Sequence, residues 1–497
     1  MDIRFVAAGS GDVLAVMAGE GGELLASAQA LDTATGGRLS KAAKAARFTG
    51  GPGQVVDVLA PEGVDFSRIL VIGIGKLDAA NGLAVERWAG HAVKRTLTSG
   101  AEKLVLQPEA LPGVSKADAG AHAALGARLA AYRFDTYRTK LKPEQKPTLT
   151  TVEVALEGPA AARARADQDA AVVEGVFFAR DLVSEPPNVL YPESFAERLR
   201  DLETIGVEVE ILEPATMEKL GMGALLGVAQ GSARPARLVS MKWNGSSSKN
   251  AKPIALVGKG VTFDTGGISL KPGAGMDEMK GDMGGAAAVA GAMKAIALRK
   301  AKANVVGVVA LVENMPGPNA QRPGDIVNTM SGQTIEVLNT DAEGRLILAD
   351  AVWYAQDKFS PSAVIDLATL TGAVIVALGH ENAGLYANDE DLAQAIISAG
   401  ANEGETVWRM PLSAAYDKMI DTPNADMKNI SGKPAAGSIV GAQFIKRFVK
   451  DGTPWAHIDI AGTAWKPGPY EDPLSPAWAT GYGVRLLNRL IAAKYED

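Results

Sequence analysis

Short runs of β-branched and aliphatic residues recur along the first third of the chain, and Ala-rich stretches separate them. Runs of this length, bounded by turn residues, predict β-strands at 55–59, 68–74, 103–106 and 150–156. The stretches at 83–97 and 117–131 have helical spacing. This order predicts a small α/β domain over residues 1–158.

A single long helix is predicted to follow this domain. Residues 159–183 are rich in Ala, Arg and Glu, and their apolar positions fall on one helix face. The pattern ends before Pro186 and Pro187, which cannot continue a helix. We therefore interpret 159–190 as a connecting helix and linker.

Strand and helix patterns alternate again through residues 191–497. Apolar runs typical of buried strands lie at 254–257, 305–312, 335–338, 364–367 and 457–460, and helical stretches at 285–298 and 344–354 lie between some of them. The alternation predicts a larger catalytic domain with a mainly parallel central sheet flanked by helices. Ligands of such sheets bind outside the carboxyl ends of the strands, so acidic residues just after the apolar runs are candidates for function.

Length, charge and cysteine content narrow the class of protein. A chain of 497 residues is too long for one compact core, which supports two domains. The absence of cysteine excludes disulfides, thiolate metal sites and a cysteine nucleophile. A net charge of −7 argues against a nucleic-acid binder, which usually has a basic balance. Residues 1–20 lack the pattern of a signal peptide and no apolar run could span a bilayer, so we expect a cytoplasmic protein without membrane contact.

Three segments of the larger domain carry charged side chains at the expected places. Residues 258–264 come after the first apolar run of this domain, 279–285 precede an Ala-rich helix, and 339–346 follow another apolar run. These segments and the residues just beyond the first contain three aspartates, one glutamate, three lysines and one arginine: Lys259, Asp264, Lys271, Lys280, Asp282, Asp341, Glu343 and Arg345.

Gathered carboxylates repel one another unless cations neutralise them. Two divalent ions about 3.5–4 Å apart are a common hydrolytic arrangement that supplies hydroxide at neutral pH, and a nearby cationic side chain stabilises the oxyanion that forms. The four histidines lie outside the three segments, so carboxylates would supply most ligands. Taken singly, 341–345 also suits an ordinary helix N-terminus and 264–267 an ordinary turn. The metal hypothesis depends on their combination.

Together the three segments resemble the leucine aminopeptidase (cytosol aminopeptidase) family of metallopeptidases. The matching motifs are VGKGVTFDTGG at 257–267, MKGDMGG at 279–285 and NTDAEGRL at 339–346, the last being the signature octapeptide of that family. Residues 180–188 resemble its domain-junction segment, and 71–76 resemble a strand and turn of its N-terminal domain. The resemblance implies a macro-like N-terminal α/β domain. It also implies a metal-dependent exopeptidase that releases leucine and other apolar residues from peptides with a free N-terminus, through a hydroxide bridging two metal ions.

The resemblance also assigns roles to residues. The implied metal ligands are Lys259, Asp264, Asp282, Asp341 and Glu343. The ions would be Mn²⁺ or Zn²⁺, with Mg²⁺ as a further candidate. Lys271 would polarise the scissile carbonyl, and Arg345 would anchor a bicarbonate ion acting as the general base. The implied pocket for the first side chain consists of Met279, Thr369, Gly372, Ala461 and Ala464, and the implied assembly is a homohexamer.

Lys259 requires a physical check, because an ammonium group has no lone pair for a metal. Holding it neutral near pH 7, against an ordinary pKa of about 10.4, costs roughly 5 kcal/mol. Adjacent divalent cations and burial both favour the neutral form.

Two other functions are weighed against the peptidase. A DNA-binding regulator or recombination accessory role, known for some members of the family, is disfavoured by the acidic composition; Arg38, Lys41, Lys44 and Arg47 are a candidate basic patch. A phosphoesterase would use the same two-metal chemistry, but the signature octapeptide argues against it. Salt-sensitive DNA retardation and phosphate release from a generic ester would reveal these functions.

Overall fold

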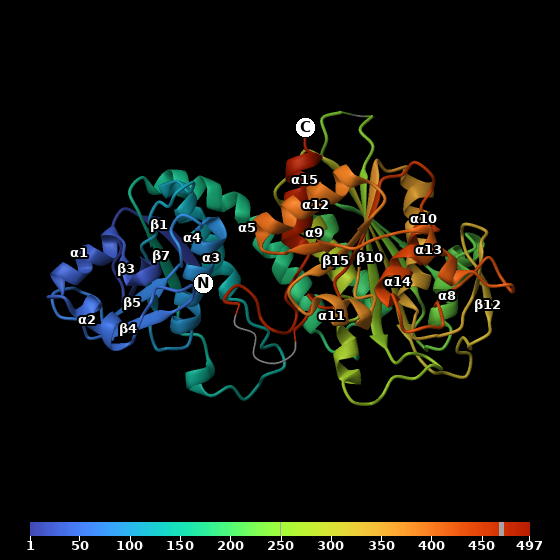
Figure 1. The fold of residues 1–497 in the computed structure, drawn as a ribbon, viewed down its shortest axis with the longest axis horizontal. Helices are drawn as coiled ribbons and strands as arrows, with labels where there is room; N and C mark the ends of the chain where they lie inside the picture. The colour runs from blue at the N-terminus through green and yellow to red at the C-terminus, as the bar shows by residue number, and fades with distance from the viewer. Residues whose placement is uncertain (249, 467–471) are drawn as a thin grey trace. The chain divides into compact units, whose positions relative to one another are not determined.

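The computed structural model describes residues 1–248, 250–466 and 472–497, and it divides into two compact units (Figure 1). The first unit comprises Met1–Val173 and a later segment that ends at Pro476. The second unit begins at Glu174 and includes Ala477–Asp497. The division falls within helix α5 (Pro159–Ser184), which coincides with the long helix predicted between the domains.

The first unit contains a twisted sheet with helices on both faces. Its strand order is β1-β7-β6-β2-β5-β4, with β3 paired to β2, where the strands are β1 (Asp2–Val6), β2 (Val13–Gly19), β3 (Glu23–Leu24), β4 (Val55–Leu59), β5 (Arg68–Gly73), β6 (Lys103–Leu106) and β7 (Thr151–Ala155). Alternate residues of β2 enter opposite cores because side chains of a strand alternate between faces. One core includes α3 (Gly82–Thr96) and α4 (Lys116–Ala130), and the other includes α1 (Ala26–Ala34) and α2 (Arg38–Ala45).

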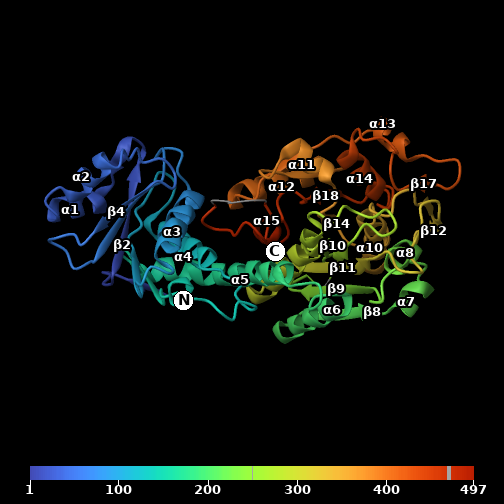
Figure 2. The same cartoon turned by 90° about the horizontal axis from the view of Figure 1, so that it is seen from below.

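The second unit is built on an eight-stranded sheet whose centre is parallel (Figure 2). The order is β16-β15-β18-β14-β10-β11-β9-β8, with β8 (Glu208–Leu212), β9 (Arg237–Asn244), β10 (Ile254–Asp264), β11 (Asn304–Asn314), β14 (Ala363–Ala368), β15 (Ala383–Ala387), β16 (Val407–Arg409) and β18 (Trp455–Asp459). Helix α9 (Gly284–Leu298) packs on β10, β11 and β14. Helices α8 (Gly223–Ala229), α10 (Gly344–Phe359) and α14 (Gly437–Lys446) share a core with the alternate residues of β10 and β11.

Glycine at the start of α9 allows the helix to lie unusually close to the sheet. A Cβ at Gly285 would lie 2.0 Å from the Leu367 carbonyl oxygen of β14, and a Cβ at Gly258 on β10 would lie 2.6 Å from Ala286 Cα. Both neighbours are backbone atoms that cannot give way. This close approach brings Asp282, two residues before α9, to Lys259 of β10.

Two predicted features of the sheet are wrong in detail. The first apolar run was expected to end at residue 257, but β10 continues to Asp264 because its glycines and polar residues also pair with β11, with a register shift between Val261 and Phe263. Lys259 and Asp264 therefore lie within the strand. The run at 335–338 only overlaps β13 (Thr334–Glu336), which pairs with β12 (Ile326–Asn328) and β17 (Met427–Lys428) in a separate small sheet.

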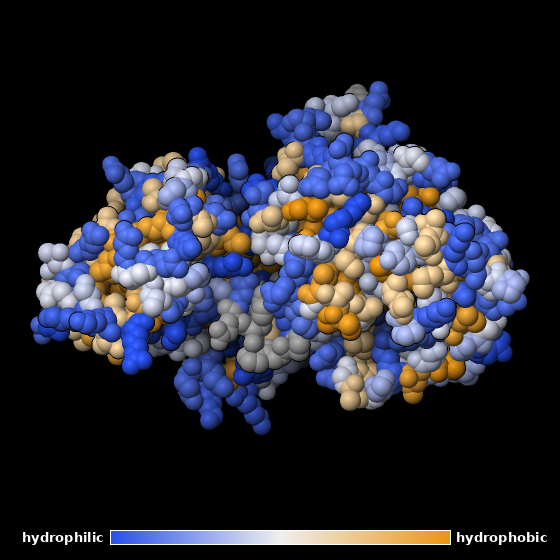
Figure 3. All heavy atoms as spheres, in the orientation of Figure 1, coloured by the Kyte–Doolittle hydropathy of each residue, from blue (hydrophilic) through white to orange (hydrophobic). Residues whose placement is uncertain are grey.

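Figure 3 shows that polar and apolar side chains are mixed on one face of the molecule, with apolar side chains gathered over α11 (Gly372–Leu378). Val376 of α11 is 90% exposed, and Trp408 of β16 is 61% exposed. Among the residues described, no helix combines the length and the apolar character needed to cross a membrane.

Candidate metal centre

Charged residues from three parts of the second unit meet at one site. Strand β10 contributes Lys259 in its middle and Asp264 at its end. Asp282 directly follows the 3-10 helix η4 (Met276–Gly281), near the start of α9. Asp341 and Glu343 lie in the segment that leads into α10, with Glu343 at the N-cap position.

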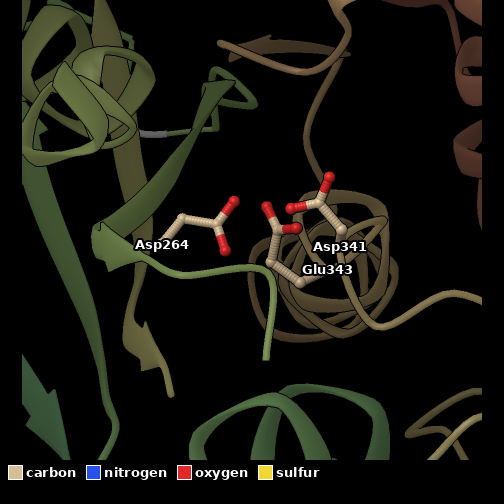
Figure 4. Close-up of side chains that lie close together, drawn as sticks. All are labelled: Asp264, Asp341 and Glu343. Atoms are coloured by element: carbon tan, nitrogen blue, oxygen red, sulfur yellow. The ribbon is translucent and has the colours of Figure 1, made fainter. Parts of the chain in front are cut away.

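Three carboxylates of this site face one another. Asp264, Asp341 and Glu343 each offer an oxygen, and these three oxygens lie within 4.8 Å of one another (Figure 4). Asp264 and Glu343 are buried, and Asp341 is partly accessible. Buried carboxylates at this separation repel strongly, because water screens little of the charge.

Two lysines lie among these carboxylates. Lys259 Nζ lies 2.7 Å from Asp282 Oδ1 and 2.9 Å from Glu343 Oε1, and it donates to the Thr369 carbonyl at 2.8 Å. Lys271, in the loop after β10, contacts a different pair of carboxylates. Its Nζ is 2.9 Å from Asp264 Oδ2 and 2.5 Å from Asp341 Oδ1.

Burial is the largest influence on the carboxyl groups. Burial and the Glu343 carboxylate together raise the pKa of Asp264 to about 6. Burial also raises the pKa of Asp282 well above its ordinary value, and burial with Glu343 raises the pKa of Asp341. Burial acts on Glu343 as well, but the two lysines outweigh it, so the pKa of Glu343 is lowered. The protein alone therefore does not fully compensate the negative charge that this cluster can carry.

The lysines respond in the opposite sense. Burial lowers the pKa of Lys259, but the carboxylates of Asp282, Glu343 and Asp264 outweigh it and leave the pKa raised. The pKa of Lys271 is raised by the same balance of burial and carboxylates. Lys259 is thus protonated in the protein alone. Its nitrogen would be free to bind a metal only if cations neutralised the surrounding carboxylates.

Two buried oxygens fit such cations. Asp282 Oδ2 and Glu343 Oε2 have no hydrogen-bond donor among the residues that the structure describes. A buried oxygen without a donor is costly unless something else satisfies it. Hard divalent ions bind carboxylate oxygens of this kind, so the donor set fits metal binding.

Arg345 is the second residue of α10 and is also buried. Its Nη1 donates to the Asn429 carbonyl at 2.8 Å, whereas its Nε has no acceptor among the described residues. Burial lowers the pKa of Arg345 to about 10, so the guanidinium remains charged at neutral pH. A buried cation with an unused donor suits a small anion.

Among the residues of the predicted side-chain pocket, Thr369 contacts this site directly, since its hydroxyl donates to Asp282 Oδ1 at 2.8 Å. Thr369 and Ala464 flank Gly284, where an added Cβ would lie 3.3 Å from Thr369 Cγ2 and 3.2 Å from Ala464 Cβ. Met279 lies in η4, the 3-10 helix that ends directly before Asp282. Gly372 is exposed and has open space where a side chain would begin, and Ala461 follows β18.

Asn314 is a site residue that sequence reasoning missed. It ends β11 in register with Asp264, and its Nδ2 donates to Asp264 Oδ1 at 2.8 Å and to the Thr340 carbonyl at 3.0 Å. Inspection of every residue at a strand end would have found it, but attention to acidic residues alone did not.

Two histidines of the second unit form hydrogen bonds away from the carboxylate cluster. His457 Nδ1 lies 2.5 Å from Asp366 Oδ1 in a fully buried pair, and His380 Nδ1 lies 2.8 Å from the Gly462 carbonyl oxygen. Neither is among the residues that could share an ion with the carboxylate cluster.

Known proteins similar to this chain carry the same two-part organisation. Residues 177–488 match the catalytic domain of the cytosol aminopeptidase family, and residues 13–141 match its N-terminal domain. A probable cytosol aminopeptidase of Caulobacter vibrioides is 55% identical over 500 residues, covering 100% of both chains. Another, of Agrobacterium fabrum, is 53% identical over 504 residues, covering 100% of this chain and 99% of the relative.

Solved structures agree with these matches. A mutant of tomato leucine aminopeptidase has a TM-score of 0.88 at 34% identity, covering 99% of this chain and 96% of that one. The bottromycin maturation enzyme BotP in complex with Mn has a TM-score of 0.83 at 34% identity, covering 97% and 99%.

Proposed function

Because this chain belongs to the cytosol aminopeptidase family and is a peptidase, we propose that it releases N-terminal residues from peptides at a two-metal centre. The observation that supports this most directly is the meeting of Asp264, Asp341 and Glu343 oxygens within 4.8 Å.

The proposed ligands are Lys259, Asp264, Asp282, Asp341 and Glu343. Two divalent ions bound there would act as Lewis acids and supply hydroxide at neutral pH. Mn²⁺ and Zn²⁺ are the proposed ions, with Mg²⁺ as a further candidate, and the Mn complex of BotP supports the first. The donorless oxygens of Asp282 and Glu343 support ligation.

Lys271 and Arg345 have separate proposed roles. Lys271 keeps a positive charge beside Asp264 and Asp341, and this charge would stabilise the oxyanion that develops on the scissile carbonyl. Arg345 would hold a bicarbonate ion as the general base, and its unused Nε supports an anion there.

Preference for apolar first residues follows from the proposed pocket. Met279, Thr369, Gly372, Ala461 and Ala464 are apolar or small, so leucine and similar side chains fit without leaving a polar group unpaired. A substrate with a blocked amine would lose the interaction of its free amino group with a metal ion. Acetylated peptides should therefore be rejected.

The decisive experiment compares leucine p-nitroanilide with N-acetyl-leucine p-nitroanilide, in the wild-type protein and in the Asp282→Ala and Glu343→Ala variants. The wild type should cleave only the free-amine substrate, and both variants should lose turnover while retaining the wild-type circular dichroism spectrum. Undiminished activity in folded variants would contradict the ligand assignment.

We further propose a homohexamer in the cytoplasm. The 90% exposure of Val376, on an apolar helix, supports burial of this surface between subunits. Multi-angle light scattering distinguishes a hexamer from a monomer directly.

A further inference from the structure

Asp459 is a fully buried aspartate that the proposed chemistry does not use. It ends β18, in register with Ala368 at the end of the neighbouring parallel strand β14. The two segments that follow these strands contain Thr369, Gly372, Ala461 and Ala464 of the proposed side-chain pocket.

The carboxylate of Asp459 joins these two segments. Its Oδ1 accepts hydrogen bonds from the backbone N–H of Leu370 at 3.0 Å and from that of Ala461 at 3.2 Å. Its Oδ2 accepts the hydroxyl of Thr371 at 2.7 Å. One side chain thus holds residues 370 and 371 on one side and residue 461 on the other.

The first of these segments also touches the metal centre. The Thr369 hydroxyl donates to Asp282 Oδ1 at 2.8 Å, and the Thr369 carbonyl accepts from Lys259 Nζ at 2.8 Å. Thr371 additionally caps helix α11, since its hydroxyl accepts from the Val374 N–H at 3.1 Å. A shift of this segment would therefore move a wall of the pocket and two proposed metal ligands together.

We propose that Asp459 is a positioning residue that fixes the width of the pocket for the first substrate side chain. It acts by clamping segment 369–371 against residue 461, and it contacts neither substrate nor metal in this role. The inference rests on the proposed aminopeptidase function and adds a determinant of its substrate selectivity.

The test measures kcat/KM for leucine and alanine p-nitroanilides in Asp459→Asn, Thr371→Val and Thr371→Ser. In Asp459→Asn, an amide nitrogen replaces the oxygen that faces Thr371, and this nitrogen cannot accept a hydrogen bond from the Thr371 hydroxyl. Thr371→Val removes the same hydrogen bond from the other side, and Thr371→Ser retains it. We expect the leucine-to-alanine ratio to fall roughly tenfold in the first two variants, the scale of a side-chain discrimination in an apolar pocket, and to recover in Thr371→Ser.

Asp350→Asn is a matched control for simple loss of stability. Asp350 is equally buried and accepts from the backbone N–H groups of Leu225 at 2.9 Å and Met330 at 2.8 Å, but it touches neither pocket segment. We expect this variant to lower the Tm and leave the substrate ratio unchanged. If Asp459→Asn fails to fold, the comparison of Thr371→Val with Thr371→Ser still tests the proposal.

The double variant Asp459→Asn with Thr371→Val should lower the ratio no further than either single variant, because both remove one shared interaction. An active wild type with an unchanged ratio in Asp459→Asn and Thr371→Val would overturn the positioning role alone. An inactive wild type would overturn the proposed function as well.

Discussion

Lys259 Nζ lies 2.9 Å from Glu343 Oε1, and each side chain is only 3% exposed. The second oxygen of Glu343 has no donor within residues 1–248, 250–466 and 472–497. Divalent ions bound by this carboxylate would therefore compete with the lysine for it. This competition explains how a lysine with a raised pKa could still release its proton. Divalent cations at Glu343 and Asp282 would neutralise the carboxylates that raise the pKa of Lys259.

Metal removal is expected to abolish activity and lower stability. A chelator should eliminate turnover of leucine p-nitroanilide, and added Mn²⁺ or Zn²⁺ should restore it. Since ions bind only the folded site, a hundredfold excess over Kd should raise the free energy of unfolding by roughly 2–3 kcal/mol. Differential scanning fluorimetry measures the corresponding rise in Tm. A Tm that changes neither when divalent ions are added nor when excess chelator removes them would contradict the metal centre.

Lys271→Met should separate catalysis from metal binding. The substitution removes the proposed oxyanion donor but none of the proposed ligands, so kcat should fall on the order of 10²–10³-fold, as for loss of one oxyanion donor. Mn²⁺ affinity by calorimetry should stay near or above that of the wild type, because a competing cation beside Asp264 and Asp341 has gone. A large loss of Mn²⁺ affinity would place Lys271 among the groups needed for metal binding.

The raised pKa of Asp264 predicts how metal binding depends on pH. Burial and Glu343 raise its pKa to about 6, so below that pH a proton must leave before an ion can bind. Mn²⁺ affinity, measured by titration calorimetry between pH 5 and 8, should fall as the pH drops below about 6. Proton release, obtained by repeating the titration in buffers of different ionisation enthalpy, should rise over the same range.

The same group has a defined effect on the stability of the metal-free protein. Its folded pKa lies above the unfolded value of about 3.9, so its stabilising contribution is complete below about pH 4 and is lost as the pH rises through about 6. In excess chelator, the stability of the wild type relative to Asp264→Asn should therefore decrease across this window. An increase would mean that the carboxylate is better solvated or paired than the structure indicates.

The sequence was most informative where the chemistry was local. Apolar runs located β4 and β6 to the residue, and Pro186 marked the end of α5, because these signals depend on neighbouring residues. The grouping of Asp264, Asp282, Asp341 and Glu343 followed from the resemblance, and the structure places them around two lysines.

Features set by the register between strands were not accessible in the same way. The length of β10 beyond residue 257 depends on pairing with β11, and Asn314 reaches Asp264 only because the two residues share that register. The clamp formed by Asp459 depends equally on β14 and β18 lying side by side. Single-sequence periodicity contains no information on which strands are neighbours.

Gly344→Ala should impair the site without removing any charged group. A Cβ at this position would lie 2.7 Å from Lys259 Cε and 2.9 Å from its Nζ, both closer than side-chain carbons normally approach. Lys259 cannot easily move aside, because its ammonium is held among Asp282, Glu343 and Thr369. We expect weaker Mn²⁺ binding and at least a tenfold lower kcat/KM, which is the typical loss when residues that orient metal ligands are changed.

Gly273→Ala is the control, since a Cβ there meets no atom within 4 Å and activity should be unchanged. Wild-type Mn²⁺ affinity and activity in Gly344→Ala would show that the position of Lys259 is not important for the centre.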